Sequence, residues 1–298
     1  MNWQYRLIAL YLYICKSYDE KLRHLLVRES NNSDLSFSDA EVMTIYIWGV
    51  MKKRSKISEI YEYANENLRD WFPNLPNYHA FVQRLNKISH LFEVLTACIF
   101  SEFPKELHRP ELARIIDSMP IILAQNGRRF KACVAQEIAS ASGFCAAKNL
   151  YFYGVRLHMM GAYSQGNLPV PEYFCVLDAG FADIRAYEQI AEILPEGTRV
   201  FADKAYQSAG KPVHDKQNHA LFTPVKKKKG QKALDSADKL LSSAISSVRQ
   251  PIESLFNWIE DKTKIQFASK VRSYQGLMVH IFGKLATAFL ILTEKFSS

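Results

Sequence analysis

The first third of the chain carries the hydrophobic spacing of amphipathic helices. Residues 38–41 (SDAE) form a capping-box pattern, which predicts that a helix begins there. Asn77 is placed to cap the next helix, and apolar side chains then return every three or four residues from 81 to 95, so they line one face. We therefore expect an all-helical N-terminal domain over residues 1–108.

Beyond residue 108 the pattern changes to short apolar runs that are typical of β-strands. A helical segment over 184–194 separates two of these runs and ends at Pro195. Strands that alternate with helices predict an α/β sheet with a partly parallel order. The predicted strands are 112–116, 151–160, 173–177, 199–202 and 219–225.

The C-terminal part returns to helical spacing. Residues 239–262 predict a helix, and Pro251 inside it predicts a kink or two helices that meet there. A final apolar helix is expected over roughly 276–295. Residues 109–298 are thus expected to form one α/β domain that ends in helices.

We expect neither a membrane-spanning segment nor a disulfide framework in this chain. The apolar stretches Leu7–Cys15 and Leu285–Leu292 are shorter than the roughly 20 residues that span a bilayer, so we interpret both as buried helix segments. The five cysteines are odd in number and form no C-x-x-C pair, which favours a reducing cytoplasm over disulfides or a zinc ribbon.

Composition and charge narrow the class of protein. The 298 residues are 48% hydrophobic and 23% charged, which excludes a disordered, collagenous or disulfide-stapled chain. The net charge of +8 suggests a polyanionic partner. Residues 1–203 hold 22 basic and 23 acidic residues, a net of −1, whereas 204–298 hold 16 and 7, a net of +9. The basic excess is therefore C-terminal.

Three carboxylates lie where an α/β protein places functional groups. Asp117 and Asp203 follow predicted strands, and Glu253 lies in the later helix. Taken singly, an aspartate at a strand end is more often a turn former or a helix cap. Asp178 and Asp183 occupy similar places, and composition alone does not exclude them.

The order of these carboxylates and the residues around them resemble the DDE transposases and integrases of the ribonuclease-H-like superfamily. Two further segments, 38–42 and 72–85, resemble the helical N-terminal region of bacterial insertion-sequence transposases. The matching words are IDSMP at 116–120 (family I-D-S-x-P), NLYFYGVRLH at 149–158 (Y-Y-G-x-K-L-H), ADKAY at 202–206 (G-D-K-G-Y) and RQPIESLF at 249–256 (R-x-x-I-E-x-x-F).

The resemblance implies a ribonuclease-H-like mixed sheet flanked by helices. It implies that Asp117, Asp203 and Glu253 are catalytic and hold two Mg²⁺ or Mn²⁺ ions, which assist in-line displacement at phosphorus. The expected activity is strand cleavage and strand transfer that move an insertion element. The expected partners are double-stranded DNA at terminal inverted repeats, read by the N-terminal helices, and target DNA. Two ends processed together imply a homodimer, in the bacterial cytoplasm at the nucleoid.

Other residues are candidates for DNA contact or for supporting the carboxylates, each with a plainer alternative. Arg249 either orients Glu253 or contacts a phosphate, or it forms an ordinary helix surface pair. His158 is either a buried strand histidine or part of the site, and the lysines are either solvated or bound to phosphate. The candidates are Arg156, His158, Lys204, Lys226, Lys227, Lys228, Lys229, Arg249 and Lys262.

The sequence departs from the family pattern at five positions. A DNA-contacting lysine is therefore either shifted to Lys262 or lost. Two alternatives stay open: an impaired relative that binds DNA without reacting, and a metal nuclease that does not join strands. The departures are Ala202 and Ala205 for both glycines, Arg156 for a lysine, and Ser246 and Glu260 where some relatives carry Tyr and Lys.

Overall fold

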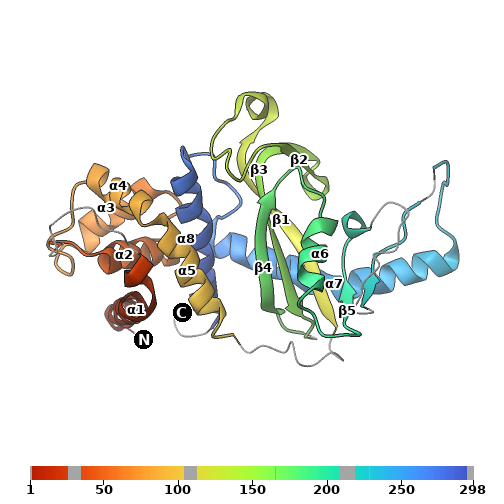
Figure 1. Ribbon diagram of the computed structural model, residues 1–298, viewed down its shortest axis with the longest axis horizontal. Helices are drawn as coiled ribbons and strands as arrows, with labels where there is room; N and C mark the ends of the chain where they lie inside the picture. The colour runs from red at the N-terminus through yellow and green to blue at the C-terminus, as the bar shows by residue number, and fades with distance from the viewer. Residues whose placement is uncertain are drawn as a thin grey trace. The chain divides into compact units, whose positions relative to one another are not determined.

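The computed structural model describes residues 2–25, 35–103, 113–164, 166–207, 219–227 and 229–293. Its contacts divide the chain into two compact units, drawn in Figure 1. The helical unit contains Met1–Glu102, Cys133–Glu137 and Ile259–Ser298. The sheet unit contains Phe103–Ala132 and Ile138–Trp258. All five cysteines are free thiols.

The helical unit begins its helices where the capping residues predict. Ser38 Oγ accepts a hydrogen bond from the backbone N–H of Glu41 at 3.2 Å, and the Glu41 carboxylate accepts one from Ser38 N–H at 2.6 Å. Asn77 Oδ1 accepts a hydrogen bond from Ala80 N–H at 3.0 Å and so caps the helix that begins at Tyr78. Its helices are α1 (Trp3–Ser17), continued by Tyr18–Leu22 and Arg23–Leu25, α2 (Asp39–Met51), α3 (Ile57–Asn67), α4 (Tyr78–Lys87), α5 (Ser89–Phe100) and α8 (Tyr274–Leu292).

The apolar run from 81 to 95 belongs to two helices, so the prediction of one helix is wrong. The chain leaves helical geometry at Ile88, which has φ −97° and ψ 15°. Ile88 and the apolar residues on both sides of it are buried. The spacing is therefore kept across the break, and periodicity does not reveal it.

The last helix packs among the N-terminal helices, which differs from the domain boundary expected at residue 108. α8 contacts α2, α4 and α5, and Thr96 Oγ1 of α5 donates to the Phe282 carbonyl at 2.8 Å. At Gly283 an added Cβ would lie 2.4 Å from the Tyr46 ring, so only glycine allows this close approach. α8 is long and apolar enough to cross a membrane, but 72% of its apolar 18-residue stretch is buried within the structure.

The sheet unit contains a six-stranded mixed sheet. Its central strand β1 pairs antiparallel with β3 and parallel with β5, which pairs parallel with β6. The other edge of β3 pairs antiparallel with both β2 and β4. The elements are β1 (Arg114–Gln125), β2 (Ser142–Cys145), β3 (Leu150–Ala162), β4 (Val170–Asp178), α6 (Ile184–Ala191), β5 (Arg199–Phe201), β6 (Ala220–Phe222) and α7 (Ser236–Thr263) as far as Trp258, since its last turn is assigned to the helical unit. The predicted α/β, ribonuclease-H-like architecture is confirmed.

Strand β1 continues past the point where the sequence predicted its end. It runs to Gln125, so Asp117 lies inside the strand rather than after it. Pro120 made this extension hard to predict, because proline has no backbone N–H to donate to a neighbouring strand and is therefore rare in strands paired on both sides. On one edge β1 pairs with β3 throughout, while on the other β5 pairs only with Arg114 and Ile115. The proline therefore lies beyond the stretch that is paired on both sides.

Alternation along β1 sends neighbouring side chains to opposite faces of the sheet. Ser118 is paired with His158 and shares its face, on which α6 packs through a core that includes Tyr187 and Ile190. Asp117 is paired with Met159 and points to the other face, toward α7. Figure 1 shows α6 in front of the sheet and α7 behind it.

A lysine buried in the helical unit makes its stability depend on pH. Lys284 is 1% exposed, and its ammonium group donates to the Lys264 carbonyl at 3.0 Å. Burial lowers the pKa of Lys284 to about 7, although Glu260 and Glu59 act in the opposite direction. Above pH 7 the unfolded chain therefore binds more protons than the folded one, so the free energy of unfolding rises with pH until the unfolded lysine also titrates.

We expect Lys284→Met to remove this dependence. Lys284 contributes a slope of up to about 1.4 kcal/mol per pH unit between its folded and unfolded pKa values. Urea unfolding at several pH values, followed by tryptophan fluorescence, measures the slope. Lys270→Met, at an exposed lysine of the same unit, should keep it. An unchanged slope in Lys284→Met would contradict the assignment.

Candidate functional site

Two of the three predicted carboxylates bind the same guanidinium group. Arg249 Nη1 lies 2.5 Å from Asp117 Oδ2 of β1, and Arg249 Nη2 lies 2.5 Å from Glu253 Oε1. The Asp117 and Arg249 side chains are mostly buried, whereas Glu253 is half-exposed. One arginine thus joins the sheet to the helix behind it, at the residues where the sequence placed the chemistry.

Helix α7 places Arg249 and Glu253 one turn apart on the same face. Of the two alternatives expected at Pro251, a kink or two helices, the second is wrong, because α7 is one helix from Ser236 to Thr263. Ile245, Ile252 and Leu255 are buried before and after the proline. This continuous apolar stripe holds the helix together across the missing backbone hydrogen bond.

Strand pairing brings the third carboxylate beside Asp117. β5 runs parallel to β1, and the last paired residues are Ile115 and Phe201. Asp117, inside β1, and Asp203, after β5, each follow two residues later, so they lie next to each other just beyond the paired stretch of these parallel strands. The Asp203 carboxylate also accepts a hydrogen bond from the backbone N–H of Ala205, which fixes the turn after β5.

Burial and like charge act together on Asp117. The pKa of Asp117 is raised to about 7, mainly by burial and also by the charges of Asp203 and Glu253, although Arg249 acts in the opposite direction. Burial also disfavours the charged form of Arg249, but Asp117 and Glu253 outweigh this and raise its pKa. Near neutral pH the negative charge of the carboxylates is thus reduced in two ways, by the Arg249 guanidinium and by partial protonation of Asp117.

The donor set suits a hard divalent cation, because all three groups offer carboxylate oxygens. Among the described residues, no three potential ligands stand close enough as they are to hold one ion. The reason is local, since Asp117 and Glu253 are both turned onto Arg249. Arg249 Nε is buried and makes no hydrogen bond to the described residues. A buried donor without a hydrogen-bond partner is uncommon in folded proteins.

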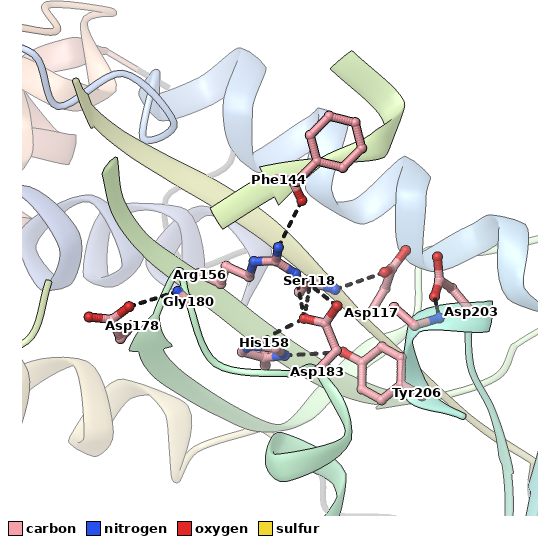
Figure 2. A network of polar contacts seen from close by, with 11 residues as sticks. Asp117, Ser118, Phe144, Arg156, His158, Asp178, Gly180, Asp183, Asp203 and Tyr206 are labelled. Atoms are coloured by element: carbon pink, nitrogen blue, oxygen red, sulfur yellow. Dashed lines mark hydrogen bonds and ion pairs between the residues drawn. The ribbon is translucent and has the colours of Figure 1, made fainter. Parts of the chain in front are cut away.

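A second polar network lies on the opposite face of β1 (Figure 2). At its centre Asp183 accepts from Arg156 Nη1 at 2.8 Å and from Ser118 Oγ at 3.2 Å. The other end of the Arg156 guanidinium donates to the Phe144 carbonyl at 2.8 Å. Arg156 therefore has a buried structural partner, and through Ser118 the network fixes the backbone next to Asp117.

His158 lies inside this network as a neutral side chain. Burial lowers its pKa to about 4, although Asp183 acts in the opposite direction. Its Nε2 lies 3.8 Å from Asp183, and its Nδ1 lies 3.1 Å from the Tyr206 hydroxyl. Burial raises the pKa of Tyr206, and the nearby carboxylates add to this. A proton on His158 Nε2 therefore lets Nδ1 accept from the tyrosine.

Asp183 and Tyr206 are the residues that sequence reasoning left unassigned. Tyr206 stands in the ADKAY word at 202–206, so that word carried a signal for it. Asp183 looked the same as Asp178, yet the structure separates them. Asp178 accepts from Ser140 Oγ at 2.8 Å and from Gly180 N–H at 2.7 Å, so it holds a turn.

The predicted DNA-contacting lysines fall in different places. Lys204 is exposed directly after Asp203, and Lys226, Lys227 and Lys229 are exposed in the loop after β6. Lys228 lies outside the described residues. Lys262 belongs to the helical unit, where its ammonium group lies 3.9 Å from Asp261.

Neither alanine that replaces a family glycine occupies a backbone conformation that needs glycine. Ala202 and Ala205 are absent from the positive-φ positions of the described residues. Ala202 is buried in the core under α6, and its N–H donates to the Phe222 carbonyl at 2.9 Å. Ala205 is exposed. The two methyl groups are therefore compatible with the turn that presents Asp203.

Comparison with known proteins agrees with this geometry. A family model described as the transposase DDE domain matches residues 108–290, which is more than half of the chain. No curated protein and no solved structure matches the chain.

Arg156 and Asp183, in the network on the α6 face, should be energetically coupled. Asp183→Asn leaves the mostly buried Arg156 without its counterion, which we expect to cost about 3 kcal/mol of unfolding free energy. Arg156→Met together with Asp183→Asn should recover part of that loss, because no unpaired charge remains. Urea unfolding of both single variants and the double variant measures the coupling. Strictly additive losses would show that the two side chains do not interact.

Proposed function

Because this chain belongs to the transposase DDE domain family, we propose that Asp117, Asp203 and Glu253 catalyse strand cleavage and strand transfer of an insertion element. The family implies DNA binding and a transposase-type function, and its members generally use divalent metals. The observation that carries the proposal is the single guanidinium held by Asp117 and Glu253, with Asp203 at the end of the adjacent strand.

The three carboxylates would hold two Mg²⁺ or Mn²⁺ ions. Divalent ions at such a site activate the attacking oxygen and stabilise the leaving oxygen during displacement at phosphorus. Asp117 must lose its proton to act as a ligand, so its raised pKa opposes loading at low pH. The sheet and α7 supply fixed positions for these oxygens, and Arg249 keeps Glu253 turned toward Asp117.

Arg249 has a second role in this proposal. In the protein without DNA it offsets the mutual repulsion of the carboxylates. Divalent cations would take over that function, which leaves the guanidinium able to bind a phosphate oxygen of the substrate. We assign Lys204, exposed next to Asp203, to the DNA backbone on the same reasoning.

The proposed partners are DNA and a second copy of the chain, as the proposed function requires. We assign the terminal inverted repeats to the helical unit, and we assign the target DNA to the sheet unit. Two ends must be processed together, so the active complex would be a homodimer, at the nucleoid of a bacterial cytoplasm. The accommodated Ala202 and Ala205 favour a reactive enzyme over an impaired relative. An assay with target DNA distinguishes strand transfer from simple hydrolysis.

Removing any one of the three carboxylates should abolish the reaction. Asp117→Asn, Asp203→Asn and Glu253→Gln should each lower Mg²⁺-dependent cleavage and joining of labelled terminal-repeat DNA by about 10³-fold or more, because each removes a metal ligand. Binding of the same DNA, measured by gel shift, should persist. Glu188→Gln, at an exposed carboxylate of α6, is the matched control and should react normally. Normal activity in any of the three variants would remove that residue from the site.

The lysine loop should contribute to DNA binding through charge. Changing Lys226, Lys227 and Lys229 to Gln should flatten the dependence of log Kd on log salt by about 0.9 for each phosphate that the loop no longer neutralises. Fluorescence anisotropy with duplex DNA over a range of salt concentrations measures this slope. An unchanged slope would exclude the loop from the interface.

A further inference from the structure

An exposed group of aromatic rings lies beside an arginine in the sheet unit, away from the carboxylates. We call Arg129, Phe130, Phe144 and Tyr151 the aromatic–arginine surface. Phe130 is 75% exposed, Tyr151 53% and Phe144 39%. Rings this open to water add little to the stability of the fold.

The rings are arranged around the guanidinium. Phe144 of β2 and Tyr151 of β3 are direct cross-strand partners, with ring centroids 4.7 Å apart. The guanidinium of Arg129 lies 4.2 Å from the Phe130 centroid and 5.0 Å from the Tyr151 centroid. A cation over a ring is favourable, and here it keeps these exposed side chains together.

The surrounding sequence is basic, which the average over the first 203 residues conceals. Residues 118–171 contain five basic residues and one acidic residue, Glu137. Three of the five, Arg128, Arg129 and Lys131, lie in the short helical segment that follows β1. Exposed rings surrounded by positive charge suit a ligand that combines flat apolar groups with negative charge.

The surface is connected to the catalytic strand. The backbone carbonyl of Phe144 accepts from Arg156, which also binds Asp183, and Asp183 accepts from Ser118 next to Asp117. Figure 2 shows the Phe144 ring turned away from these polar groups while its carbonyl receives Arg156. A ligand on the rings would therefore lie on the same sheet as Asp117.

We propose that the aromatic–arginine surface binds unpaired bases of single-stranded or opened DNA, through stacking on Phe130 and Tyr151 and charge from Arg129. This inference rests on the proposed function, since it specifies the DNA that the same unit takes. Nucleobases are flat, and the backbone that joins them carries a phosphate at every nucleotide, so a single strand matches the rings and the basic segment together. Paired bases within a duplex do not expose their faces to such a surface.

The test compares variants that lose the rings with variants that keep them. Phe130→Leu with Tyr151→Leu retains apolar bulk, whereas Phe130→Tyr with Tyr151→Phe retains both rings. Phe267→Leu is the matched control, at a ring that is also 53% exposed but lies in the helical unit. The probes are fluorescent oligothymidylate of about 12 nucleotides and a blunt duplex of equal length.

The leucine pair should bind oligothymidylate about tenfold more weakly and should bind the duplex within about twofold of the unchanged protein. The ring-keeping pair and the Phe267 control should bind both probes normally, and circular dichroism verifies folding. Equal binding of oligothymidylate by the leucine pair would overturn the inference. A lower molecular mass of the leucine pair than of the unchanged protein, measured by sedimentation, would also overturn it, because the rings would then join two copies of the chain.

These outcomes are independent of the catalytic test. If the carboxylate variants lose strand transfer while the leucine pair binds normally, this inference fails and the proposed function stands. If the carboxylate variants react normally while the leucine pair loses single-strand binding, the proposed function fails and the surface stands.

Discussion

The site depends on holding carboxylates together against their mutual repulsion. Asp117 and Glu253 come from residues 136 positions apart in sequence, and Arg249 Nη1 and Nη2 each lie 2.5 Å from one of them. Without a cation, gathering these groups with Asp203 in a partly buried place would be unfavourable. The guanidinium and the raised pKa of Asp117 offset that cost in the free protein, and divalent ions would offset it during reaction.

The two faces of β1 carry different polar groups. Asp117 faces α7 and binds Arg249, whereas Ser118 faces α6 and joins a network centred on Asp183. That network is buried and hydrogen-bonded, so it holds the strand in place without presenting charge to solvent. The strand that carries Asp117 is therefore held by this network on one face, while Asp117 binds Arg249 on the other.

The three carboxylates proposed as catalytic could be selected from the sequence because each stands in a recognisable motif. The proximity of Asp117 and Asp203 follows from strand pairing, since each lies two residues beyond the last paired residues of the neighbouring parallel strands β1 and β5. Asp183 could not be separated from Asp178, because only long-range contacts distinguish a network centre from a turn anchor. The length of β1 could not be predicted because it contains Pro120. A proline is allowed at this position only because β5 stops pairing with β1 before it. The partners of α8 were hidden as well, because an apolar helix shows that it is buried but not against what.

The most direct measurement of the central claim is cleavage of the backbone by iron at the metal site. Fe²⁺ with ascorbate generates radicals that cut the chain near a bound ion, and Mg²⁺ should compete for the same place. If Asp117, Asp203 and Glu253 form one metal site, the cuts should map to the three segments around these residues and disappear together in Asp203→Asn. Cuts that leave any of these segments intact, or that persist in Asp203→Asn, would contradict the account.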